Sequence, residues 1–141
     1  MLSDVEAKLV QTCHAGRLGT IARDGRPNLV PVCYAYTDGQ FVIPVDQKPK
    51  RAGKLARIRN IERDPRVTLL IDHYDDDWSQ LAWVRVEGTG HITERGAEAP
   101  DAIAALRSRY RQYETMNLEE LPLITIEPER VVSWRWEEDA S

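Results

Sequence analysis

The first third of the chain alternates apolar runs with short turn dipeptides. Apolar, β-prone residues fill positions 18–22, 29–36 and 41–45. Asp24-Gly25 lies between the first two runs, and Asp38-Gly39 lies between the second and the third. Asp-Gly between β-prone runs is a strong signal for a tight hairpin. The pattern therefore predicts an antiparallel meander of three strands.

Three further extended segments are predicted in the rest of the chain. In the second of them, Gly88 and Gly90 interrupt a long β-prone run, which is typical of a bulge or of a close backbone approach. Two glycines so close together in one strand favour a sheet that curls towards a barrel. The segments span residues 66–73, 81–93 and 123–136, and the last forms one strand or two, divided at Pro128.

Three segments carry helical signals. Ser3 and Glu6 form a Ser-x-x-Glu capping box, which predicts a helix over residues 3–14. A second helix is expected over residues 54–64, where every third residue is apolar and a proline follows. A third is expected over residues 100–113, with one apolar face. The order of the elements predicts an α+β protein with an antiparallel sheet, and nothing in it alternates as a Rossmann unit would.

The composition is that of a soluble globular chain. With 141 residues, 42% hydrophobic and 30% charged, it is expected to form one domain over residues 1–141. No apolar run approaches the roughly 18–20 residues that a membrane-spanning helix needs. Asp4 and Glu6 stand where a secretory signal would carry basic residues and then an apolar run. We therefore expect a cytoplasmic protein without a membrane partner.

Positive charge is concentrated in one window. Between Lys48 and Arg66 the chain has eight basic and two acidic residues, a net charge of +6, although the whole chain has a net charge of −4. Such a cluster in an acidic protein indicates either an anion-binding site or a solvated basic helix face. A nucleic-acid groove is disfavoured, because the rest of the chain is acidic and contains a single Phe.

No set of residues reads as a self-sufficient catalytic or metal centre. Cys13 and Cys33 match no zinc spacing and are expected to be small buried residues. The three consecutive aspartates at 75–77 lack the spacing of a calcium loop, so a solvated turn is the better interpretation. No Ser-His-Asp set or Gly-x-Ser-x-Gly motif is present. We predict no protein-ligated metal and no named catalytic residue, so that any reactive group comes from a cofactor.

The basic window suits the phosphate end of such a cofactor. Phosphate is bound by several donors that converge from a loop and from the first turn of a helix. The window offers loop residues, first-turn residues and one neutral donor a turn later: Lys48, Lys50 and Arg51, then Lys54 and Arg57, then Asn60.

Segments 41–78 and 81–92, together with the order of elements, resemble the pyridoxamine 5′-phosphate oxidase-like split-barrel flavoproteins. The most specific piece is Arg-Ile-Arg-Asn-Ile at 57–61, followed by Asp-Pro-Arg-Val at 64–67. The similarity is greatest to an actinobacterial branch of oxidoreductases that use the deazaflavin coenzyme F-420. It extends from about Leu9 to Trp136 and implies an antiparallel split β-barrel with flanking helices.

The resemblance also implies a homodimer with a cofactor groove on each side of the interface. In the family, basic residues at the end of the third strand and in the following helix meet the phosphate, which are the positions already singled out by charge. The ring system follows the third strand, and the second subunit contributes late-strand residues. Here the ring positions are Ile43, Pro44 and Val45, and the late-strand positions are Trp78, Trp134 and Arg135.

The expected activity is hydride transfer from reduced F-420 to a small organic acceptor. The Arg-x-x-x-Leu-Lys stretch of true pyridoxamine phosphate oxidases is missing, and residues 27–36 stand in its place. This departure disfavours the vitamin B6 reaction and tight FMN binding, and the surplus of basic residues suits the acidic tail of a deazaflavin. An FMN-binding split-barrel oxidoreductase and a non-catalytic flavin-binding module remain the alternatives.

Overall fold

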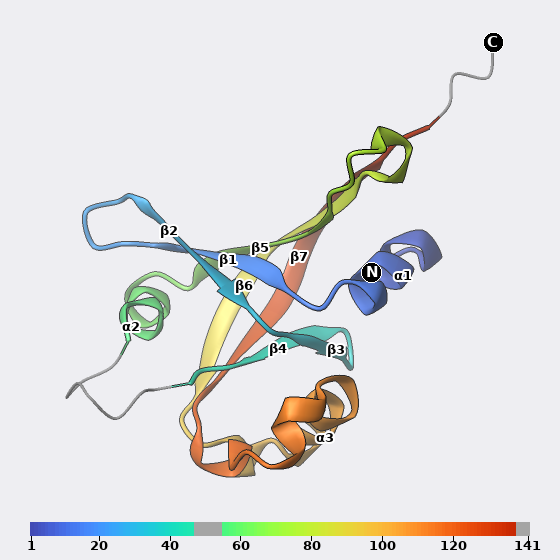
Figure 1. The fold of residues 1–141 in the computed structure, drawn as a ribbon. Coiled ribbons are helices and arrows are strands. Elements are labelled where there is room, and N and C mark those ends of the chain that lie inside the picture. Colours follow the sequence, from blue (N-terminus) through green and yellow to red (C-terminus); the bar gives the residue numbers. More distant parts are fainter. Residues whose placement is uncertain (47–54, 138–141) are drawn as a thin grey trace.

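Seven strands form one curled antiparallel sheet in the order β2-β1-β5-β6-β7-β4-β3 (Figure 1). The computed structural model describes residues 1–46 and 55–137. Three α-helices flank the sheet, and within the described residues none is long and apolar enough to cross a membrane. The elements are α1 (Asp4–Thr12), β1 (Gly16–Ile21), β2 (Pro27–Val32), β3 (Ala35–Thr37), β4 (Gln40–Pro44), α2 (Ala56–Arg63), β5 (Arg66–His73), β6 (Ala82–Thr93), α3 (Pro100–Arg109) and β7 (Leu123–Arg135).

The long strands β6 and β7 curl the sheet at a bulge. The register between them shifts between Glu87 and Gly88, and Gly88 lies opposite Pro128. A Cβ atom on Gly88 would lie 2.2 Å from the carbonyl oxygen of Glu127, so only glycine fits. The predicted bulge is confirmed, and Pro128 sits within one continuous β7 instead of dividing it in two. The result is the predicted α+β split barrel.

The predicted three-strand meander is wrong. The β1–β2 and β3–β4 hairpins form as the Asp-Gly signals predict, but β2 and β3 lie at opposite ends of the strand order. The single strand expected over 29–36 is interrupted at Cys33 and Tyr34, which belong to no strand. The backbone N–H of Tyr34 donates to the hydroxyl of Tyr110, 3.1 Å away, instead of to a neighbouring strand. The chain therefore crosses from one edge of the barrel to the other at this point.

Strand β4 is buried on both faces. Phe41 and Ile43 enter the main core inside the barrel, together with the inward residues of β1, β5, β6 and β7. Val42 points the other way, into a second apolar cluster that it shares with Ile103 and Leu106 of α3. The strand that was expected to contact the cofactor ring is therefore one of the most enclosed parts of the fold.

The helices largely begin and end as predicted. The Ser3–Glu6 capping box is present in α1. In α2, Ile58 and Ile61 pack into the main core. The third helix ends at Arg109 rather than at 113, because Tyr110 adopts an extended conformation, and a 3-10 turn follows over Arg111–Glu114. In Figure 1, α1 lies to the right of the strands and α2 to the left, and both helices pack against the main core.

Candidate functional site

The N-terminal end of α2 has no side-chain cap. Its N-cap residue is Leu55, which cannot accept a hydrogen bond through its side chain. The carbonyl oxygen of Leu55 accepts from the N–H groups of Ile58 and Arg59, at 3.1 and 3.2 Å. The positive end of the helix dipole is therefore not balanced by an acceptor side chain from α2 itself.

Arg57 lies in the first turn of this uncapped helix. It is half-buried, and its Nε atom is enclosed with no hydrogen-bond partner among residues 1–46 and 55–137. Burial lowers the pKa of the Arg57 guanidinium, and the nearby charge of Asp46 partly opposes that shift. An enclosed donor without an acceptor costs free energy unless a ligand supplies one. Together, the uncapped helix end and the unpartnered Nε form a position suited to an anion.

Asn60 contributes to the fold instead of pointing towards that position. Its side chain is 5% exposed, and its amide nitrogen donates to Thr20 Oγ1 on β1 at 3.0 Å. Its amide oxygen accepts from Arg63 Nη2, also at 3.0 Å. Arg63 in turn donates to the carbonyl oxygen of Ile21. These contacts fasten α2 to β1.

The basic residues of the window differ in what they contact. Arg66 forms a two-pronged interaction with Asp64, whose pKa the hydrogen bonds lower to about 2. Arg59 is exposed on the outer surface of α2. Lys48, Lys50, Arg51 and Lys54 lie outside the described residues.

The three residues expected beside a cofactor ring differ in access. Ile43 and Val45 are fully buried in the main core, and Pro44 is half-buried at the end of β4. The N–H of Val45 donates to the carbonyl oxygen of Pro122. A ring that followed β4 would consequently contact Pro44 and the strand backbone rather than the side chains of Ile43 and Val45.

Two of the three expected late-strand residues come together. Trp134 and Arg135 line a cavity of about 600 Å³ between α1 and the ends of β6 and β7. Trp78 does not line it, and its side chain is 62% exposed in the short 3-10 turn before β6. Sequence reasoning missed Glu6 and Ser133, which line the same cavity and bond across it. The capping box revealed one role of Glu6, but no local pattern connects it with a residue 127 positions away.

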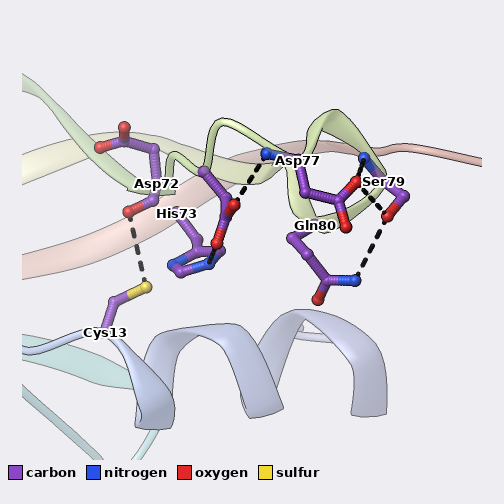
Figure 2. A network of polar contacts seen from close by, with 7 residues as sticks. Cys13, Asp72, His73, Asp77, Ser79 and Gln80 are labelled. Carbon is purple, nitrogen blue, oxygen red and sulfur yellow. Dashed lines mark hydrogen bonds and ion pairs between the residues drawn. The ribbon is translucent and has the colours of Figure 1, made fainter.

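The acidic loop after β5 is organised by its own turns (Figure 2). Asp75 accepts from the backbone N–H of Asp77, and Asp77 accepts from both the N–H and the hydroxyl of Ser79. These bonds lower the pKa of Asp77. Cys13 donates to the carbonyl oxygen of Asp72 at 3.5 Å, and burial raises the pKa of its thiol. Residues 1–46 and 55–137 contain no group of three or more His, Cys, Asp and Glu side chains that could hold a metal ion.

Comparisons with known proteins agree with this architecture. A conserved hypothetical protein of Mycobacterium tuberculosis is 27% identical, over 96% of this chain and 86% of its own, with a TM-score of 0.75. An FAD-binding protein of Mesorhizobium loti is 24% identical over 94% of both chains, with a TM-score of 0.67. A heme storage protein of Vibrio cholerae is 17% identical over 96% of this chain and 95% of its own, with a TM-score of 0.70.

The last two likenesses show the fold alone. The family model for pyridoxamine 5′-phosphate oxidase, in contrast, matches residues 2–135, which is nearly the whole described chain. The curled antiparallel sheet, the flanking helices and this match lead to one assignment: the chain belongs to the pyridoxamine 5′-phosphate oxidase family.

Proposed function

We propose that this protein binds a flavin-type cofactor through its phosphate at the N-terminal end of α2, and that the cofactor is coenzyme F-420. The observation that carries the proposal is the enclosed Nε of Arg57, which has no partner in the part of the chain that the structure describes, beside a helix end whose N-cap residue offers no side-chain acceptor. A phosphate oxygen would supply the missing acceptor and would also be favoured by the helix dipole. Lys48, Lys50, Arg51 and Lys54 precede this helix in the sequence and are proposed to add positive charge.

The choice of a deazaflavin over FMN rests on charge and on a missing motif. The Arg-x-x-x-Leu-Lys stretch is absent, and the window from Lys48 to Arg66 has a net charge of +6. A longer anion, with an acidic tail beyond its phosphate, can interact favourably with more of these basic residues than FMN can. The alternative is an oxidoreductase with ordinary FMN at the same position.

The proposed activity is an oxidoreductase reaction in which a reduced deazaflavin supplies a hydride to a small organic acceptor. The chain itself binds and orients the cofactor: Arg57 holds the phosphate end, and Pro44 with the backbone of β4 supports the ring. Tyr74 is an exposed residue that could exchange a proton with solvent, and no side chain is assigned as a general acid. In this proposal the protein binds and orients the cofactor, and the cofactor supplies the reactive group.

We propose a homodimer, because one face of the sheet exposes apolar side chains. Leu29 on β2 is 68% exposed, and it lines a shallow groove of about 530 Å³ with Leu70 and Trp83. Arg17 and Asp72, an ion pair at 3.3 Å, lie in the same groove and provide both signs of charge for a self-complementary contact. Such mixed apolar and charged surfaces are typical of interfaces. A monomer at micromolar concentration in analytical ultracentrifugation would contradict this.

The cofactor proposal is tested by titrating one preparation with oxidised F-420 and with FMN. We expect F-420 to bind more tightly. Arg57→Ala should weaken its binding about ten- to a hundredfold, since a charge-assisted hydrogen bond contributes roughly 1.5–3 kcal/mol. Arg59→Ala is the matched control, because it removes the same charge from an exposed position of the same helix and should change affinity by less than about threefold.

The outcomes separate the alternatives. Equal effects of Arg57→Ala and Arg59→Ala would mean that α2 is only a solvated basic face. Tighter binding of FMN would favour the ordinary flavin. Tight F-420 binding without turnover of quinone, enone or nitroaromatic acceptors would favour a non-catalytic binding module.

A further inference from the structure

We propose that Asp46, just after the end of β4, is a specificity-determining residue that shifts the phosphate position at α2 towards phosphodiesters and away from phosphomonoesters. The inference deepens the proposed function and rests on it, because it concerns the same anion position beside Arg57. It does not depend on the ring system that the cofactor carries. A carboxylate beside an anion position discriminates between ligands by repelling the more highly charged one.

The end of β4 and the start of α2 are both anchored in the main core. Val45, which precedes Asp46, is fully buried there, and its N–H donates to the carbonyl oxygen of Pro122 at 2.9 Å. Leu55, the N-cap residue of α2, packs against the same core. Figure 1 shows β4 running towards the side of the sheet where α2 lies. The core therefore holds Asp46 and Arg57 near each other at its rim.

Asp46 acts on Arg57 through its charge and not as the missing hydrogen-bond acceptor. Asp46 is exposed, whereas Arg57 is half-buried. Burial lowers the pKa of the Arg57 guanidinium, and the negative charge of Asp46 partly opposes that shift. The Nε atom of Arg57 nevertheless has no hydrogen-bond partner within residues 1–46 and 55–137. The carboxylate is therefore near enough to influence a charge at this position, and it leaves the Nε donor to a ligand.

The two classes of phosphate differ in charge. A phosphomonoester, such as the phosphate of FMN, has a second pKa of about 6 and carries a charge of about −1.5 to −2 at neutral pH. A phosphodiester has no second acidic proton, so it carries a single negative charge. A deazaflavin with an acidic tail beyond its phosphate is substituted on both sides of that phosphate and is therefore a diester. The choice between the two classes is a choice between a dianion and a monoanion.

The charge of Asp46 counts against the dianion more than against the monoanion. The basic residues of the window attract a phosphate in proportion to its charge, so by themselves they favour a monoester. Asp46 opposes this bias, because it repels a dianion about twice as strongly as a monoanion at the same position. The cost of taking an ion out of water also rises steeply with its charge, which disfavours the dianion further beside the half-buried Arg57.

The inference is tested with two ligands that share one ring system. FMN is the monoester, and the methyl ester of its phosphate is the corresponding diester. Quenching of flavin fluorescence gives the dissociation constant of each ligand for the full chain. Asp46→Asn should raise the affinity for FMN about tenfold and that for the methyl ester about threefold, so that the ratio of the two constants shifts about threefold towards FMN. Asp46→Glu keeps the charge and should keep the wild-type ratio.

Asp38→Asn is the matched control for net charge. Asp38 is exposed in the turn at the opposite end of β4, and its positive φ of 53° is one that asparagine adopts readily. The substitution removes the same charge as Asp46→Asn and should leave the ratio of the two constants unchanged. The effect of Asp46→Asn should also shrink as salt is added, because an exposed charge is screened. Circular dichroism of every variant confirms that the fold is retained.

The outcomes distinguish this inference from the proposed function. If Arg57→Ala weakens both ligands but Asp46→Asn leaves their ratio unchanged, the phosphate position stands and the role of Asp46 is overturned. If the ratio shifts equally in Asp38→Asn and Asp46→Asn, the effect belongs to the net charge of the chain and the role of Asp46 is again overturned. If neither ligand binds saturably, or if Arg57→Ala weakens neither, the proposed phosphate position itself fails and the inference fails with it.

Discussion

The N-terminal ends of α1 and α2 differ in whether a side chain accepts hydrogen bonds from the N–H groups of the first turn. In α1, Ser3 accepts from the N–H of Glu6, and Glu6 accepts from the N–H of Ser3, so the first turn is satisfied by its own sequence. In α2, the side chain of Leu55 provides no acceptor, and Arg57 adds a further enclosed donor. A closed helix end stabilises the fold, whereas an open one is available to a ligand.

The two helices also differ in what holds them in place. α1 forms its cap locally, but α2 depends on tertiary contacts of Asn60 and Arg63 with β1. α2 has eight residues, too few to be stable alone in water. A helix without a side-chain cap therefore persists here because Asn60 and Arg63 fasten it to the sheet.

The largest effect on stability is expected when that fastening is removed. Asn60→Ala should lower the free energy of unfolding by about 2 kcal/mol, because it removes the amide partner of the buried Thr20 hydroxyl and one of the two acceptors of Arg63, which keeps the carbonyl oxygen of Ile21. Urea denaturation measures the change. In the double variant with Thr20→Val, the loss should be smaller than the sum of the two single losses. Strict additivity would mean that the two side chains do not interact.

Removing the local cap of α1 is expected to cost less. Ser3→Ala should lower the free energy of unfolding by about 1 kcal/mol, the usual cost of losing an N-cap hydroxyl. Ser3→Asp, which preserves the acceptor and adds a charge favourable to the helix dipole, should retain most of the stability. The same denaturation experiment applies, and a loss in Ser3→Ala as large as that in Asn60→Ala would erase the contrast between the helices.

A cap introduced into α2 should compete with the anion. Leu55→Asp places a carboxylate at the helix end, so the affinity for F-420 should fall about three- to tenfold by competition and repulsion. Leu55→Asn offers an acceptor without charge and loses the same apolar contacts, so it isolates the electrostatic part. Isothermal titration calorimetry gives both constants. An affinity unchanged in Leu55→Asp would place the phosphate elsewhere.

The smallest effect is a pH dependence at α1. Hydrogen bonds from Ser133 and from the backbone N–H of Ser3 hold the pKa of Glu6 below its usual 4.5. A carboxyl group with a lowered pKa in the folded state contributes stability that is present above about pH 4.5 and is lost as pH falls through the folded value. Glu6→Gln should therefore flatten the acid side of the stability profile below about pH 4.5, as seen by thermal denaturation at stepped pH. The same slope in both proteins would contradict the role of Glu6.

Local patterns in the sequence determined most of the elements. The Asp-Gly pairs produced the two hairpins, the Ser3–Glu6 box began α1, and Gly88 placed the bulge. Each of these signals works within a few residues, where backbone geometry and short-range hydrogen bonds decide the conformation. The charge window likewise indicated either an anion site or a solvated basic helix face, because charge density is a property of the sequence itself.

Only the tertiary structure decided how these parts meet. The break at Tyr34 depends on hydrogen bonds to Val10, Cys13 and Tyr110, which are distant in the chain. The same is true of Asn60. Its position in the helix sequence allows a contact with a phosphate, but in the fold its side chain donates a hydrogen bond to Thr20 on β1. Glu6 and Ser133 are 127 positions apart and meet only because β7 pairs with β6 beside α1. Pairings of this kind follow from closing the barrel, and no local periodicity encodes them.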